Sequence, residues 1–289
     1  SSTWPAQSPL GGKRCRCDVR HSRRVPPTQD KTWRAGRFWW DCSRQADTTA
    51  YPLRAVIFDV DALSDLDLDG HRLVFNAAFA AHGLPIEWSV ARYRQLLALH
   101  DARQRVAAEL RKRCVWTECD VLTEHLVDEI CATKDIIFDE MILDLGLTPR
   151  AGLDDLVMDA FGDGVSLCVV SRGRRVWVEP LVRQLVGEGL VETVVTGDDA
   201  SQGGAAAYRH ALWELGVAPH DALAVTGSAT GLRAAGSAGL ATVLIAPDGV
   251  VAPHAAAVRA DYAGDDALRM ATCQRLHAQW WAQHSPSAA

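Results

Sequence analysis

The chain has 289 residues, 48% of them apolar, which is enough for the core of one larger domain or of two small ones. No stretch approaches the roughly 18–20 apolar residues of a membrane span, so no transmembrane segment is predicted. The eight cysteines show neither a disulfide framework nor a zinc-ligand spacing. The net charge of −6 is uneven, because residues 1–47 hold ten Lys or Arg against four Asp and leave −12 on the rest.

Residues 1–50 are rich in Arg, Pro, Ser and Trp and show no helical or strand period, which predicts an extended N-terminal arm. Its aromatic residues are typical anchors on a protein partner, and its basic charge also suits a nucleic acid. A solvated tail, or an arm packed on its own globule, stays an alternative. The chain starts at Ser1, as expected after loss of a transit peptide or for a trimmed sequence. The expected anchors are Trp4, Trp33, Phe38, Trp39 and Trp40.

A short buried strand is predicted at residues 54–59, and it ends on the acid Asp59. Apolar residues then recur at helical spacing through residues 71–145, after which strands and helices alternate. This alternation predicts an α/β fold with a parallel sheet covered on both faces. The helical insertion predicts a cap over the strand ends, where such sheets bind ligands. The later strands are expected at 166–170, 192–195, 222–225 and 242–245, with helices near 176–188, 205–215 and 229–238. The predicted division is an arm at 1–50, a core at 54–64 and 146–270, a helical cap at 65–145 and a C-terminal tail at 271–289.

Two carboxylates at the end of the first strand suit phosphoryl transfer. Asp59 could attack phosphorus, and Asp61 could protonate the leaving oxygen and later activate water. An Asp-x-Asp pair alone is weak support, because loops after strands are often acidic. A basic cluster follows a later strand and could hold an anion; it consists of Arg172, Arg174 and Arg175.

Over residues 54–266 the chain resembles the haloacid dehalogenase-type (HAD) phosphatases, and within them the CbbY-like sugar-bisphosphate phosphatases. The segments that carry the resemblance are VIFDVD at 56–61, DGHRLVFN at 69–76, Ser171 after a strand, GDD at 197–199, Tyr208, and GLRAA at 231–235 with Ala238 and Gly239. The resemblance implies a three-layer HAD-like parallel sheet (a Rossmannoid core) with an inserted helical cap. It also implies a Mg²⁺-dependent sugar-phosphate phosphatase or phosphomutase, with Ser171 on the phosphate and His71 and Lys134 on the cap.

The sequence departs from this family where the family supplies charge to its chemistry. Ala62 follows the two aspartates in place of Gly-Thr, Gln202 stands where the family has a lysine, and Thr226-Gly227 replaces acids that hold Mg²⁺. The cap loop, three glycines and a lysine in the family, reads HDAR at residues 100–103. Mg²⁺ prefers oxygen ligands anchored by carboxylates, and an attacking carboxylate and a phosphate dianion repel each other without a neutralising cation. No metal or cofactor is therefore expected. Only if the chain is active is Mg²⁺ expected, with Asp59 as its ligand.

These departures predict that Asp59, Asp61 and Ser171 are vestigial and that the chain is a catalytically inactive accessory subunit of a larger, organellar assembly. Its protein partners would bind through residues 1–50. The first alternative is a Mg²⁺-dependent sugar-phosphate phosphatase or phosphomutase of the CbbY type. The second is an organellar ribosome component or another nucleic-acid-associated protein. Kinship with proteins tied to carbon fixation favours a plastid over a mitochondrion.

Overall fold

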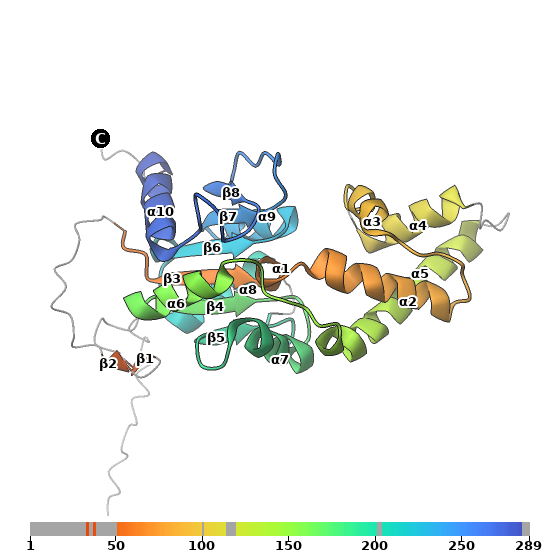
Figure 1. Cartoon of the computed structure of the whole chain (residues 1–289), viewed down its shortest axis with the longest axis horizontal. Helices are drawn as coiled ribbons and strands as arrows, with labels where there is room; N and C mark the ends of the chain where they lie inside the picture. Colours follow the sequence, from red (N-terminus) through yellow and green to blue (C-terminus); the bar gives the residue numbers. More distant parts are fainter. Residues whose placement is uncertain are drawn as a thin grey trace, which may run out of the picture.

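The structure is a computed structural model that describes residues 33–34, 37–38, 51–99, 101–113, 120–200 and 204–284. Its core is a six-stranded sheet in the order β5-β4-β3-β6-β7-β8, in which every neighbouring pair is parallel (Figure 1). The strands are β3 Ala55–Asp59, β4 Ser166–Val170, β5 Thr193–Val195, β6 Ala222–Thr226, β7 Ala241–Ile245 and β8 Ala257–Arg259. The predicted α/β fold with a parallel sheet and a helical cap is confirmed.

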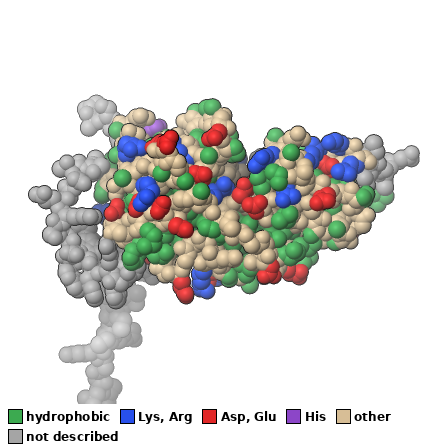
Figure 2. All heavy atoms as spheres, in the orientation of Figure 1, with side chains coloured by type: hydrophobic (Ala, Val, Ile, Leu, Met, Phe, Trp, Pro, Cys, Tyr) green, Lys and Arg blue, Asp and Glu red, His purple; other side chains and the backbone are tan. Residues whose placement is uncertain are grey.

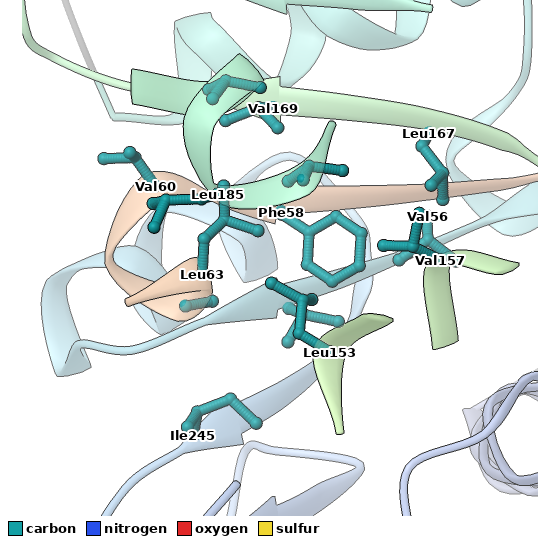
Figure 3. Packing of buried hydrophobic residues seen from close by; sticks show 14 of the residues in the cluster. Val56, Phe58, Val60, Leu63, Leu153, Val157, Leu167, Val169, Leu185 and Ile245 are labelled. Atoms are coloured by element: carbon teal, nitrogen blue, oxygen red, sulfur yellow. The ribbon is translucent and has the colours of Figure 1, made fainter. Parts of the chain in front are cut away.

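Helices cover both faces of the sheet, because the central strands are apolar on both sides. On β3, Val56 and Phe58 belong to one buried cluster and Ala55 and Ile57 to the other, as the alternation of side chains along a strand requires. Figure 3 shows Phe58 in the first cluster, between the sheet and Leu153. The first layer contains α1 Val60–Leu63, α6 Leu153–Asp163, α7 Arg175–Val186 and α10 Met270–His284, and the second contains α8 Ala205–Leu215 and α9 Ala229–Ser237.

The cap has an apolar core of its own, separate from the two clusters of the sheet. Phe75 packs against Trp88 at 4.9 Å and against Tyr93 at 6.4 Å between ring centroids. The short helices η1 Leu66–His71 and η2 Ile142–Asp144 join this cap to the core. Figure 2 shows the surface hollowed between the two parts. The cap helices are α2 Arg72–Ala81, α3 Val90–Leu96, α4 Ala102–Lys112 and α5 Asp120–Met141.

Some elements differ from the sequence-based expectation. Strand β8 is not predicted, because its three residues are all half-buried and show no readable period. The segment expected to be a C-terminal tail contains α10. None of the described helices is long and apolar enough to cross a membrane.

Only a small part of the N-terminal arm is described. The backbones of β1 Trp33–Arg34 and β2 Arg37–Phe38 pair antiparallel, with Trp33 opposite Phe38. The other expected anchors, Trp4, Trp39 and Trp40, lie outside the described residues. Contacts of the arm with a partner therefore stay predictions.

Candidate active site

The two aspartates lie where the central strand ends and a helix begins. Asp59 is the last residue of β3, and α1 starts at the next residue. Asp59 pairs in register with Val170, the last residue of β4. Because β3 and β4 are parallel neighbours, Asp61 and Arg172 both lie just beyond the carboxyl ends of adjacent strands. This is the edge at which parallel α/β sheets bind their ligands.

Contacts from three distant segments fix the turn that carries Asp61. The Gly227 N–H donates to Asp61 Oδ1 at 2.7 Å, and the Arg150 guanidinium donates to the Asp61 carbonyl at 3.2 Å. The Tyr262 hydroxyl donates to the Ala62 carbonyl at 2.9 Å, inside the core. A buried turn held in this way keeps the two carboxylates in one geometry before any substrate arrives.

Burial changes the protonation of the aspartate pair. It raises the pKa of Asp59 well above its ordinary value, and the charge of Asp61 raises it further, while the charge of Arg172 lowers it. Burial also raises the pKa of Asp61, against the Gly227 N–H and the charges of Arg150 and Arg172. The pair therefore holds a proton more readily than exposed aspartates do, as a general acid at neutral pH must.

Three of the other predicted positions lie at the carboxyl ends of β4 and β6, the strands on either side of β3. Ser171 is buried, and its Oγ accepts from the Gly173 N–H at 3.0 Å, so it closes the loop after β4. Thr226 is fully buried at the end of β6. A Cβ on Gly227 would lie 2.6 Å from the Asp61 carbonyl oxygen, so the close approach of this backbone requires glycine. Gln202 lies outside the described residues.

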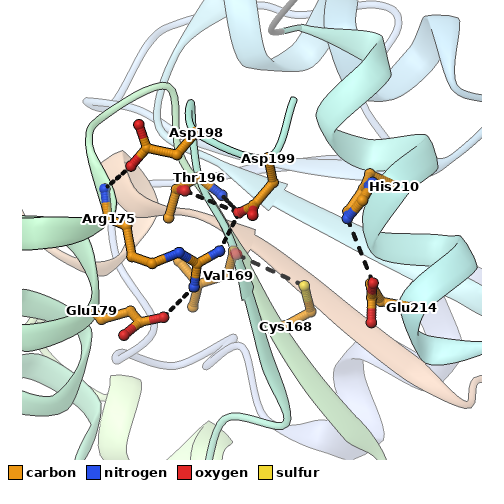
Figure 4. A network of polar contacts seen from close by, with 9 residues as sticks. All are labelled: Cys168, Val169, Arg175, Glu179, Thr196, Asp198, Asp199, His210 and Glu214. Atoms are coloured by element: carbon orange, nitrogen blue, oxygen red, sulfur yellow. Dashed lines mark hydrogen bonds and ion pairs between the residues drawn. The ribbon is translucent and has the colours of Figure 1, made fainter. Parts of the chain in front are cut away.

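The basic cluster after β4 divides into engaged and free members. Arg174 forms an ion pair with Asp139 at 2.8 Å, and Arg175 pairs with both Glu179 and Asp199 (Figure 4). The guanidinium of Arg172 makes no hydrogen bond or ion pair with another described residue. It is exposed, and its charge acts on both Asp59 and Asp61.

Asp198 and Asp199, which could in principle supply further carboxylates, are turned to other partners. Asp198 Oδ2 accepts from the Arg175 N–H at 2.8 Å, and Asp199 Oδ2 accepts from the Thr196 N–H at 2.8 Å. Figure 4 shows both side chains on Arg175 and Thr196. These bonds shape the loop after β5.

A second group of cations lies where the cap meets the core. The His71 ring stacks on Phe138 at 4.5 Å. Burial, helped by the charges of Lys134 and Arg105, lowers the pKa of His71 to about 3. Within the described residues, His71 Nδ1, Arg105 Nε and Arg150 Nε are buried without a hydrogen-bond partner. Unsatisfied buried donors and acceptors are costly in a finished core, and they are expected at a site that awaits a polar ligand.

Arg150 was missed in the sequence. It is 89 residues away from Asp61 along the chain, and no motif marks it. Arg172 is part of a recognisable cluster, but only the structure separates it from its engaged neighbours. The signal available in the sequence was that Arg172 and Asp61 each come two residues after the last residue of a predicted strand.

Comparison with known proteins identifies the class to which this site belongs. The sequence profile of the haloacid dehalogenase-like hydrolases matches residues 47–239, and the chain belongs to this family of hydrolases. It is 31% identical over 197 residues to the protein CbbY of Cereibacter sphaeroides, a match that covers 66% of this chain and 84% of that protein. It is 32% identical over 212 residues to the CBBY-like protein of Arabidopsis thaliana, and covers 66% of that protein's length. Within the family the chain is therefore CbbY-like.

Solved structures agree. The crystal structure of CbbY from Rhodobacter sphaeroides in complex with phosphate matches with a TM-score of 0.58 and 26% identity, over 76% of this chain and 99% of that one. A mutant of the same protein, in complex with xylulose-(1,5)bisphosphate, matches with a TM-score of 0.58 over 77% and 99% of the two chains. The core and the cap of this chain together thus correspond to a whole CbbY protein.

The prediction of a catalytically inactive accessory subunit is wrong. The matches are to hydrolases of the CbbY type along nearly the full length of the solved relatives, and none of them indicates an inactive or structural role. The prediction rested on local departures from the family pattern alone. It weighed the lysine missing at Gln202 and the carboxylates missing at Thr226-Gly227, and it did not include Arg150 and Arg172, whose charges lower the pKa of Asp61 in the folded chain.

Proposed function

We propose that the chain is a phosphatase of the CbbY type that hydrolyses one phosphate monoester of a sugar bisphosphate. The observation that carries the proposal is the Asp59–Asp61 pair, buried at the carboxyl end of the central strand and fixed there by Gly227, Arg150 and Tyr262. The relatives support the substrate class, because the CbbY of Rhodobacter sphaeroides has been crystallised with phosphate and, as a mutant, with xylulose-(1,5)bisphosphate.

The reaction proceeds in two displacements. A carboxylate oxygen of Asp59 attacks phosphorus, the bond from phosphorus to the sugar oxygen breaks, and Asp61 gives its proton to that oxygen. A water molecule then attacks the aspartyl phosphate, Asp61 takes the proton of the water, and inorganic phosphate leaves with Asp59 restored. The raised pKa of Asp61 supports its first role, because the group must still carry a proton when the sugar departs.

The cations between cap and core support a substrate with a second phosphate. Arg105 and Lys134 place their charges near His71, at the junction that faces the core. Buried donors such as the Arg105 Nε have no partner among the described residues. A phosphate or a sugar hydroxyl would satisfy these groups. The cap thus holds the far end of the substrate while the aspartates act on the near end.

The test is phosphate release from sugar mono- and bisphosphates, xylulose 1,5-bisphosphate included. Asp59→Asn is expected to reduce the rate of phosphate release by at least about 10³-fold, because the nucleophile is lost and the remaining residues of the site cannot take over its role. Asp69→Asn is the matched control, since Asp69 is an exposed carboxylate of the adjoining helix η1. The proposal fails if no sugar phosphate is hydrolysed, or if Asp59→Asn releases phosphate as fast as the parent.

The resemblance to CbbY proteins implies Mg²⁺, which prefers octahedral oxygen coordination anchored by carboxylates. Across the described ranges no three His, Cys, Asp or Glu side chains gather in a group that could hold a metal. The residues after β6 are Gly227 and Ser228, and the Asp61 carbonyl already accepts from Arg150. These groups do not make the carboxylate-rich oxygen set that Mg²⁺ prefers. Both displacements of the proposed reaction therefore depend on the protein's own side chains.

A further inference from the structure

We infer that guanidinium groups take the place of a divalent cation at this centre, with Arg172 binding the oxygens of the transferring phosphate and Arg150 occupying the carbonyl of Asp61. This inference rests on the proposed phosphatase and names the source of its positive charge. It concerns residues that the CbbY resemblance does not assign. Three observations carry it: the position of Arg172, its lack of other partners, and the contact made by Arg150.

The backbone positions Arg172 at the aspartates. It follows β4 by two residues, as Asp61 follows β3 by two residues, and the two strands are in register at Asp59 and Val170. Hydrogen bonds hold the backbone on both sides of Arg172: the Ser171 N–H donates to the Val195 carbonyl at 2.9 Å, and the Gly197 N–H donates to the Gly173 carbonyl at 2.9 Å. The side chain therefore extends from a fixed backbone position at the carboxyl end of β4, the strand next to β3.

The guanidinium of Arg172 is available to a ligand. Its neighbours Arg174 and Arg175 are each held by carboxylates, on Asp139 and on Glu179 with Asp199. Arg172 has no such partner among the described residues, yet it is near enough to Asp59 and Asp61 for its charge to act on both. The buried Asp59–Asp61 pair repels a phosphate, so a phosphate binds here only through direct contact with a cation. The exposed guanidinium of Arg172 can make that contact with the phosphate oxygens.

Arg150 works against a metal ion at the same place. Its Nη2 donates to the Asp61 carbonyl at 3.2 Å, so this oxygen faces a positive group already. A divalent cation there would be repelled by the guanidinium and would have to displace it. With Arg150 and Arg172 present, two positive charges offset the Asp59 carboxylate and part of the charge of a phosphate dianion.

Arginine is chemically suited to this role. Its planar guanidinium offers five N–H donors, two of which match a pair of phosphate oxygens, and it stays protonated at any working pH. Binding that depends on it is insensitive to chelators, unlike binding that depends on Mg²⁺. The two mechanisms are thus separable by experiment.

The first experiment measures binding of inorganic phosphate to the full chain by calorimetry, in EDTA and with no added metal. The parent is expected to bind, and Arg172→Gln is expected to bind ten- to hundredfold more weakly, the effect of losing a charge-assisted hydrogen bond. Arg174→Gln, the matched control, is expected to stay within twofold of the parent. Arg172→Lys keeps the charge but not the two-pronged geometry, and is expected to fall between the parent and Arg172→Gln. Thermal melting of each variant checks its folding. Because the side chain of Arg172 is exposed, its substitution should leave the melting temperature unchanged.

The second experiment measures phosphate release with EDTA and with Mg²⁺. The inference is supported if the parent releases phosphate at the same rate in EDTA and in Mg²⁺, and if Arg172→Gln loses this activity in both conditions. Phosphate binding or turnover that requires Mg²⁺ overturns it, and so does Arg172→Gln that binds phosphate like the parent. If no sugar phosphate is hydrolysed while Arg172-dependent binding of phosphate persists, the proposed phosphatase is refuted and the anion site remains.

Discussion

Two glycines of the same helix should respond in opposite ways to the same substitution. A Cβ added at Gly231, in the first turn of α9, would lie 1.9 Å from Thr226 Oγ1 and 3.1 Å from Asp59 Oδ2. A Cβ added at Gly236 meets nothing within 4 Å. Both changes to alanine favour the helix by about 1 kcal/mol, but only the first one overlaps with its surroundings.

The magnitude follows from that overlap. Real Cβ contacts essentially never fall below 3.0 Å, so Gly231→Ala must displace the buried Thr226 hydroxyl by more than 1 Å. Overpacking of this kind costs about 3 kcal/mol, which leaves a net loss of about 2 kcal/mol after the gain in helix propensity. The expected fall in Tm is about 4–8 °C, against a rise of about 2–4 °C for Gly236→Ala.

Thermal and urea unfolding measure both variants, and phosphate release reports the site. Gly231→Ala should also lower activity, because relief of the clash moves Thr226 or Asp59. Adding Thr226→Ala removes the overlapping hydroxyl, so the double variant should lose less stability than the two single changes add up to. Gly231→Ala as stable as Gly236→Ala would show that α9 does not pack against the aspartates as described.

The remaining predictions concern buried polar groups. Because burial raises the pKa of Asp59 above its ordinary value of 3.8, the folded state binds its proton more tightly than the unfolded state, and stability falls as pH rises from about 3.8 through the folded pKa. Asp59→Asn should therefore be more stable than the parent at pH 7, by about 1–2 kcal/mol, with the gain vanishing below pH 3.8; a gain that is the same at every pH would contradict this reasoning. Tyr262→Phe removes the hydroxyl that holds the Ala62 carbonyl, and should cost about 1–2 kcal/mol in urea unfolding together with part of the activity. Burial raises the pKa of the Cys168 thiol, and that of Cys273 to about 12, so peptide mapping after treatment with a thiol reagent at pH 8 should find both unmodified until the protein unfolds; rapid labelling of either one in the folded protein would disprove its burial.

The fold was predictable because its information is local. The run that ends at Asp59 and the later strands are short, apolar and bounded by helical periods, so each element could be recognised alone. The alternation of strands and helices along the chain, together with the helical insertion after the first strand, then indicated a capped parallel sheet. Strand β8 escaped because three half-buried residues carry too little pattern.

The site was predictable only in part, because its charge balance is not local. Asp59 ends a strand and Asp61 comes two residues later, so both can be found by inspection of the sequence. The two arginines whose charges act on the pair come from other parts of the chain: Arg172 follows the neighbouring strand β4, and Arg150 contacts Asp61 across 89 residues. Inspection of the sequence therefore found the lost carboxylates at Thr226-Gly227 but not the two arginines whose charges act on the aspartates in the folded chain.

The contacts that hold the α1 turn also decide when the site forms during folding. Asp61 is bound to Gly227, 166 residues further on, and the carbonyl of Ala62 is bound to Tyr262 across 200 residues. Contacts of such long range close late, because the entropy of the intervening chain must be lost first. During synthesis the aspartates emerge early, but we expect their turn to reach its final shape only when the C-terminal strands have joined the sheet. Under the proposed function, a chain that is truncated before Tyr262 is therefore expected to release no phosphate.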